Sequence, residues 1–260
     1  MQMFYLQTMN KLPAITIAFW ITKICATTLG ETAGDLLSMT LNIGYTVSSA
    51  ILLSFFLATL IIQLTTKTYK PIVYWSVILA TSTAGTTMSD FMDRTLGLGY
   101  ATGSMILAGL LMSTLLVWKV SEKSLSVTSI QSRKGELFYW IAILFSNTLG
   151  TAVGDYLADS SGLGFYGGAI LIGSLLLVIV LIYNFTKVSH VLLFWAAFVL
   201  TRPFGATFGV LLTKPLENGG LNFGTIGSSI ILFAVLAVLV GLSITLNSNL
   251  PIIPKQKSQS

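Results

Sequence analysis

Six long stretches without a charged residue constrain the fold of this chain more than any other feature. Asp, Glu, Lys and Arg are absent from positions 36–66, 71–89, 95–118, 137–154, 160–186 and 218–254. A transmembrane helix needs about 20 consecutive apolar residues, and each stretch supplies most of one. Two further apolar stretches, around 12–30 and 190–212, are interrupted only by Lys23 and by Arg202. We therefore expect an all-α, polytopic membrane protein with eight transmembrane helices.

The composition excludes the usual classes of water-soluble protein. Hydrophobic residues make up 54% of the 260 residues and charged residues only 9%, against about 25% charged residues in a typical globular chain. The basic residues are scattered and form no basic face, so we expect no nucleic acid partner. One cysteine and one histidine leave zinc, haem and iron–sulfur centres without ligands. Because no catalytic motif is present either, we do not expect an enzyme.

A fourfold internal repeat organises the apolar stretches. One tryptophan marks each copy, at spacings of 55, 65 and 55 residues: Trp20, Trp75, Trp140 and Trp195. Ten residues later each copy has a glycine, and four residues after it a second small residue, in the pairs Gly30 and Gly34, Gly85 and Ser89, Gly150 and Gly154, Gly205 and Gly209. The next residue is Asp35, Asp90 or Asp155, and Val210 in the fourth copy. Such a repeat predicts a quasi-symmetric assembly of helical hairpins.

The four copies are expected to form a single membrane domain over 1–260. They cover approximately 13–66, 71–120, 136–186 and 190–246. The longer spacing between the second and third copies predicts a cytoplasmic connector at 121–135. The polar segment 247–260 is predicted to be a flexible tail.

The recurrence of a tryptophan, a glycine and an aspartate in register over 13–246 resembles a known family. Its members are bacterial integral membrane proteins built from four copies of a two-helix repeat of unknown function. The fourth copy of this chain departs from the pattern because it lacks the acid. The resemblance implies eight membrane helices and leaves the function to be argued from the residues.

The distribution of basic residues predicts the orientation in the membrane. Ten basic residues lie in the termini and in the linkers after the second, fourth and sixth helices, and only three lie on the opposite side. The positive-inside rule then places both termini in the cytoplasm. We expect a multi-pass protein of the bacterial inner membrane, with the four repeat tryptophans as interface anchors. The small-residue pairs should let the first helices of the copies pack closely.

Acidic residues are predicted to gather where these first helices pack. Fifteen residues of helix carry an aspartate roughly 22 Å beyond its tryptophan, inside a hydrocarbon core about 30 Å thick. An ionisable residue at that depth is costly and is by default a functional-site hypothesis. Arg202 stands where the other copies have neutral residues. The predicted substrate or ion site consists of Glu31, Asp35, Asp90, Asp155 and Arg202.

Clustered carboxylates among threonine hydroxyls suit a hard cation such as Mn²⁺, Mg²⁺ or Ca²⁺, a proton or Na⁺. Glu31, Asp35, Asp90 and Asp155 are thus candidate ligands of a bound divalent cation, and the sequence suggests no other cofactor. The favoured function is a transporter or exchanger of a small cation or a cation-coupled solute, embedded in the lipid bilayer. A scaffold or assembly protein whose acids form structural ion pairs and, behind it, an intramembrane lipid-modifying enzyme are the alternatives. The sequence leaves a homo-oligomer open.

Overall fold

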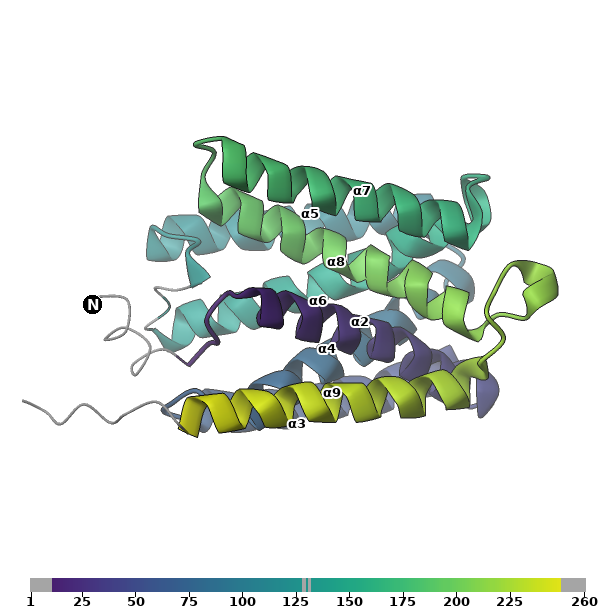
Figure 1. Ribbon diagram of the computed structural model, residues 1–260, viewed down its shortest axis with the longest axis horizontal. Helices are drawn as coiled ribbons and strands as arrows, with labels where there is room; N and C mark the ends of the chain where they lie inside the picture. The colour runs from purple at the N-terminus through teal and green to yellow at the C-terminus, as the bar shows by residue number, and fades with distance from the viewer. Residues whose placement is uncertain (1–10, 128–129, 131, 249–260) are drawn as a thin grey trace, which may run out of the picture.

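The computed structural model describes residues 11–127, 130 and 132–248. Its long helices, in chain order, are α2 (Ile17–Asp35), α3 (Tyr45–Thr65), α4 (Pro71–Asp90), α5 (Gly99–Glu122), α6 (Arg133–Asp155), α7 (Gly164–Phe185), α8 (His190–Thr213) and α9 (Gly224–Ser248) (Figure 1). Within the described residues the fold is all-α, and the prediction of eight helices in four hairpins is confirmed. The predicted tail from residue 249 onward, and residues 128, 129 and 131 of the predicted connector, lie outside the described residues.

Six of the helices are long and apolar enough to cross a membrane, as judged from length and composition. The two others are α2 and α4, the first helices of the first two copies. Helix α2 carries Lys23, Glu31 and Asp35, and α4 is rich in threonine and serine. Both helices pack among the equivalent helices α6 and α8. The polar side chains of α2 and α4 therefore lie in the interior of the bundle.

Local signals set where these first helices begin. Thr16 precedes α2, and its side-chain oxygen accepts a hydrogen bond from the Phe19 backbone N–H at 3.3 Å. Ser132 caps α6 in the same way through the Gly135 N–H at 2.8 Å. Pro71 opens α4 at a position where a missing backbone N–H has no helical partner to lose.

The first helices of the four copies form an inner ring, which we define as α2, α4, α6 and α8. Helix α2 packs against α4, α4 against α6, α6 against α8, and α8 closes the ring on α2. Each second helix packs against the first helix of the following copy, α3 on α4, α5 on α6, α7 on α8 and α9 on α2. The fourth copy thus contacts the first copy in the same way as each earlier copy contacts the next. Helix α9 ends at the same end of the bundle at which α2 begins (Figure 1).

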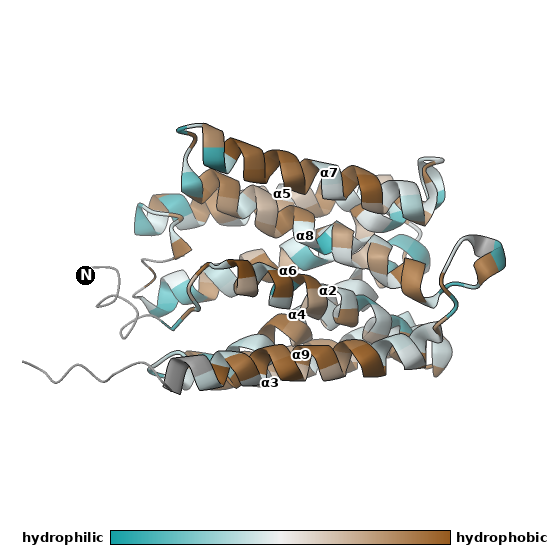
Figure 2. Cartoon of the chain, in the orientation of Figure 1, coloured by the Kyte–Doolittle hydropathy of each residue, from teal (hydrophilic) through white to brown (hydrophobic). Residues whose placement is uncertain are grey.

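The outer helices present apolar side chains to the surroundings. Hydrophobic residues cover α7 and α9, while hydrophilic residues gather near the ends of the bundle (Figure 2). Ile61, Met105, Leu177 and Val238 are each more than half exposed and come from α3, α5, α7 and α9. An apolar belt of this kind is what contact with lipid chains requires. The chain is accordingly a multi-pass membrane protein.

Glycines set the register between neighbouring helices of the inner ring. A Cβ on Gly85 would lie 3.0 Å from the backbone nitrogen of Thr148 and 3.1 Å from the carbonyl carbon of Asn147. The other first glycines face the equivalent residue of the following copy, Gly30 against Ser82, Gly150 against Arg202 and Gly205 against Thr27. A side chain at these glycines would push the helices apart. The close approach brings the residues that stand seven positions after each tryptophan into the centre of the ring.

The repeat tryptophans do not anchor the helices at the lipid interface as predicted. Trp75, Trp140 and Trp195 are buried in the core, and Trp20 is half-buried. Each ring contacts the aromatic residue that precedes the tryptophan of the previous copy, in the pairs Phe19 and Trp75, Tyr74 and Trp140, Tyr139 and Trp195, Phe194 and Trp20. Aromatic pairs gain stabilisation beyond the area that they bury. This layer closes the end of the ring where the inner helices begin.

Candidate functional site

Side chains of the inner ring fill its axis in successive levels, about 6 Å apart because each step is four helical residues. The levels lie 3, 7, 11 and 15 residues after the tryptophans. We name them by their charged members: the lysine level (Lys23, Ile78, Ile143, Phe198), the arginine level (Thr27, Ser82, Asn147, Arg202), the glutamate level (Glu31, Thr86, Thr151, Ala206) and the aspartate level (Asp35, Asp90, Asp155, Val210). All sixteen side chains are buried.

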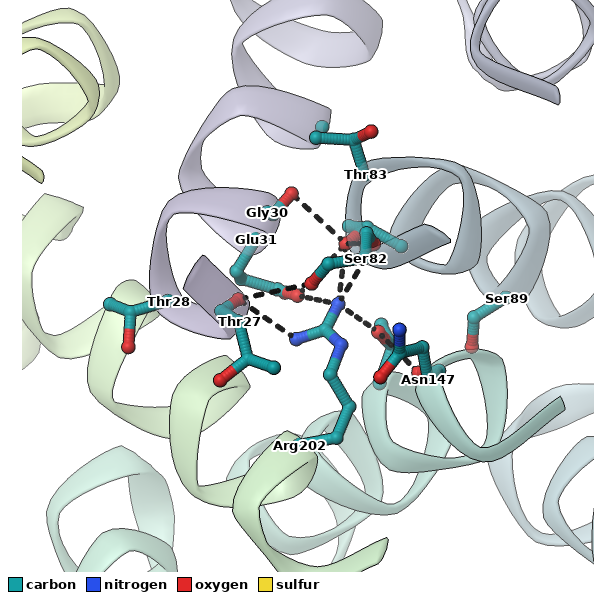
Figure 3. A network of polar contacts seen from close by, with 12 residues as sticks. Thr27, Thr28, Gly30, Glu31, Ser82, Thr83, Ser89, Asn147 and Arg202 are labelled. Carbon is teal, nitrogen blue, oxygen red and sulfur yellow. Dashed lines mark hydrogen bonds and ion pairs between the residues drawn. The ribbon is translucent and has the colours of Figure 1, made fainter. Parts of the chain in front are cut away.

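Arg202 lies at the centre of this arrangement (Figure 3). Its Nη2 donates to Oε2 of Glu31 at 2.9 Å, to Oγ1 of Thr86 at 2.6 Å and to Oγ1 of Thr151 at 2.7 Å. Its Nη1 donates to the carbonyl oxygen of Thr27 at 3.4 Å. The guanidinium of the fourth copy therefore contacts every other copy.

The ion pair between Arg202 and Glu31 explains how two charges remain inside the bundle. Both side chains are almost completely excluded from the surface. Removing a charge from water is expensive unless a counter-charge and further hydrogen bonds replace its hydration. Thr86 adds such a bond, since its hydroxyl lies 3.2 Å from Oε2 of Glu31. Two residues of the predicted site are thus brought together.

The aspartate level lies beyond this pair, at the outer end of the axis. Nε of Arg94 lies 2.9 Å from Oδ1 of Asp90, and its Nη2 lies 3.4 Å from Oδ2 of Asp155. The Arg94 side chain is 36% exposed, so this end of the axis borders the surroundings. Asp35 has no hydrogen bond or ion pair among the described residues. The three carboxyl groups nevertheless interact electrostatically with one another.

Two tyrosines complete the surroundings of Arg94. Its Nη1 donates to the hydroxyl oxygen of Tyr45 at 3.4 Å. Its guanidinium carbon lies 5.9 Å from the ring centroid of Tyr45 and 5.7 Å from that of Tyr100, within the range of a cation–π interaction. We define Arg94, Tyr45, Tyr100 and the aspartate level together as the outer vestibule.

Comparison with known protein families finds a match in each of the four copies. A family model described as "Repeat of Unknown Function (DUF347)" matches residues 18–69, 73–124, 138–189 and 193–247. The chain belongs to the DUF347 repeat family. Each match covers one inner helix and the outer helix that follows it, so one DUF347 repeat is one hairpin. No curated protein and no solved structure matches the chain.

The first three DUF347 repeats share a local feature that sequence reasoning missed. Their inner helices continue as π-helical turns, η1 (Leu36–Thr40), η2 (Phe91–Thr95) and η4 (Tyr156–Ser160). In η2 the Leu96 N–H bonds to the carbonyl of Phe91, five residues earlier, at 2.9 Å. Each turn directly follows an aspartate of the axis, whereas α8 of the fourth repeat continues as α-helix through Val210. Such turns are frequent at functional sites.

Arg94 lies in the π-helical turn η2 and faces Asp90 and Asp155. Arg94 lies four residues after Asp90, a spacing that places two helical side chains together. That spacing was the available sequence signal.

The structure assigns different partners to the four acids predicted as metal ligands. Glu31 lies with Arg202 one level deeper than the aspartates, and Asp90 and Asp155 face Arg94. Over the described part of the chain, no group of three or more His, Cys, Asp and Glu side chains is arranged to hold a metal ion. The role of these acids in this DUF347 protein as metal ligands stays a prediction.

Proposed function

We propose that this protein is a transporter or exchanger of a small cation, which moves along the axis of the inner ring. The observation that carries the proposal is the sequence of ionisable groups along that axis. The aspartate level stands at its outer end, and the pair of Glu31 and Arg202 stands at its centre. Charged side chains inside a membrane domain are costly and typically mark ion pathways.

The outer vestibule has the charge expected of a cation entrance. Its three carboxyl groups outnumber the cations near them, which are Arg94, paired with Asp90 and Asp155, and Lys214, which acts electrostatically on Asp35. At the same level, Asp35 forms no ion pair with any of the described residues. A cluster of one sign within low-dielectric walls raises the local concentration of the opposite ion. An arriving cation would compete with Arg94 for Asp90 and Asp155.

The pair of Glu31 and Arg202 would act as the central barrier. The atoms of this ion pair lie between the outer vestibule and the lysine level, in which the three side chains other than Lys23 are apolar. A cation can pass only when Glu31 exchanges its bond to Arg202 for one to the cation. This requirement favours a carrier, with a conformational change in each cycle, over an open pore.

We also propose that the protein lies in the bacterial inner membrane with both termini in the cytoplasm. Basic residues gather at the end of the bundle where the inner helices begin, including Lys67, Lys70, Lys119, Lys123, Arg133, Lys134 and Lys187. The loops at the opposite end contribute Arg94 and Lys214. The positive-inside rule supports this orientation.

Uptake into proteoliposomes tests the transport proposal. The purified protein is tested against a panel of Mn²⁺, Mg²⁺, Ca²⁺, Zn²⁺ and H⁺. A triple variant carries Asp35→Asn, Asp90→Asn and Asp155→Asn, and Glu217→Gln serves as the control because Glu217 is an exposed acid between α8 and α9 that lies outside the outer vestibule. Selective uptake that the triple variant loses and the control keeps is the expected result. Uptake that persists in the triple variant would contradict the proposed path.

A membrane scaffold is the second candidate, and one observation favours it. Arg202 and Arg94 together provide counter-charges for Glu31, Asp90 and Asp155, as in a static network. A scaffold would show no flux of any cation. Substitution of its acids would lower stability without changing an activity.

A further inference from the structure

Lys23 is a buried amine on the axis that none of the contacts described so far uses. It occupies the lysine level of the first repeat, where the other repeats have Ile78, Ile143 and Phe198. Its side chain is buried, and Nζ has no hydrogen-bond partner among the described residues. Nζ lies 3.7 Å from the centroid of the Phe198 ring. A lysine in such a place normally extends its amine to water, which Lys23 does not do.

No acid on the neighbouring helices is available to Lys23. Helix α8 offers Arg202, a like charge at the next level, which holds Glu31. Helix α4 offers Tyr74, whose hydroxyl pairs with that of Tyr139 on α6 at 2.7 Å, and the distant Asp90. Helix α9 has no titratable side chain between Gly224 and Thr245.

The charges along the axis balance in only one protonation state of Lys23. Arg202 and Glu31 neutralise each other at 2.9 Å. An ammonium at Lys23 would therefore add one uncompensated charge to a dry apolar level, at a high cost in free energy. With a neutral amine at Lys23, the lysine, arginine and glutamate levels together carry no net charge. The cation–π contact with Phe198 is too weak to replace a counter-ion.

Building on the transport function proposed above, we propose that Lys23 carries the coupling proton, so that the protein exchanges its cation for protons. When the axis opens to one side, the Nζ lone pair accepts a proton from water and becomes an ammonium. When the axis opens to the other side, the ammonium returns that proton to water. The ammonium and a cation bound near Glu31 repel each other, so the axis holds one of them at a time.

Proteoliposomes with a pH-sensitive dye in the lumen test the coupling. The comparison is between the wild type, Lys23→Met, which keeps the apolar stem, and Lys119→Met, which removes an exposed lysine of α5. With whichever cation of the panel the wild type carries, an imposed pH gradient should drive uptake, and uptake should change the lumenal pH. Lys23→Met should lose both effects, and Lys119→Met should keep both. Proton movement by Lys23→Met equal to that of the wild type would overturn the proposal.

Thermal unfolding in detergent at a series of pH values tests the proton site without any transport. If the folded protein keeps the amine neutral, the unfolded chain binds one more proton, so the wild type gains stability as pH rises. Lys23→Met lacks this contribution. The midpoint of the wild type should therefore fall further on acidification than the midpoint of Lys23→Met. Parallel profiles would overturn the proposal. An absence of cation flux in the wild type would instead refute the proposed function.

Discussion

Nη2 of Arg202 lies 2.9 Å from Oε2 of Glu31, and the pair joins the fourth repeat to the first at the centre of the inner ring. These two repeats are the furthest apart in the sequence. Bonds to Thr86 and Thr151 connect the same guanidinium to the second and third repeats. One side chain therefore links all four copies, and the ring closes through hydrogen bonds and charge as well as through packing.

Breaking this ion pair should destabilise the protein strongly. Removal of one partner of a buried pair leaves an uncompensated charge, which typically costs about 3–5 kcal/mol. We expect Arg202→Met to lower the free energy of unfolding by an amount in this range, measured by denaturant titration in detergent micelles. The double variant with Glu31→Gln should recover part of the loss. A double variant as unstable as the sum of the two single variants would show that the pair does not couple.

Close packing at the helix seams predicts a position-dependent effect of glycine substitution. A Cβ at Gly85 meets the backbone of α6, which cannot rotate away, whereas a Cβ at Gly109 on α5 meets nothing within 4 Å. We expect Gly85→Ala to cost about 1–3 kcal/mol of stability, as overpacking typically does. Gly109→Ala should be neutral or slightly stabilising, because alanine is the better helix former. Equal midpoints for the two variants in thermal unfolding would contradict the close seam.

The tyrosine pair near the tryptophan layer offers a test of buried hydrogen bonding. The hydroxyls of Tyr74 and Tyr139 lie 2.7 Å apart and are both buried. Tyr139→Phe leaves the Tyr74 hydroxyl without this partner, at a typical cost of about 1–3 kcal/mol. Phenylalanine at both positions should restore much of that stability, because no hydroxyl then remains unpaired. If the double variant is less stable than Tyr139→Phe, an unpaired hydroxyl is not the cause of the stability that Tyr139→Phe loses.

Asp35 is the acid whose substitution best separates function from stability. It is buried but forms no ion pair among the described residues, whereas Asp90 lies 2.9 Å from Arg94. We expect Asp35→Asn to reduce cation uptake into proteoliposomes while the unfolding midpoint stays close to that of the wild type. Asp90→Asn should reduce both. Loss of stability without a change in uptake for Asp35→Asn would favour the scaffold.

Cysteine labelling can test the orientation in the membrane. The native thiol, Cys25, is buried, so introduced cysteines dominate the labelling. Thr68, between α3 and α4, and Leu96, between η2 and α5, are exposed in connections at opposite ends of the bundle. In spheroplasts, a membrane-impermeant maleimide should label Leu96→Cys and spare Thr68→Cys until the membrane is lysed. The opposite pattern would place the termini outside the cytoplasm.

The helices and their repetition could be predicted from the sequence because both are local properties. A run of uncharged residues predicts a membrane helix whatever surrounds it. The regular distances from each tryptophan to its glycine and aspartate already place Glu31, the three aspartates and Arg202 on equivalent helices. The predicted site residues all lie on the axis, at three successive levels.

The partners of these residues depended on how the copies close into a ring, which no local pattern contains. Arg202 meets Glu31 because Gly205 lets α8 approach α2, across an interval of 171 residues. Trp75, Trp140 and Trp195 are buried because each ring packs against an aromatic residue of the previous copy, whereas isolated tryptophans generally prefer the lipid interface. The unpaired amine of Lys23 is likewise a property of the assembled ring, since only there do Phe198 and Arg202 surround it.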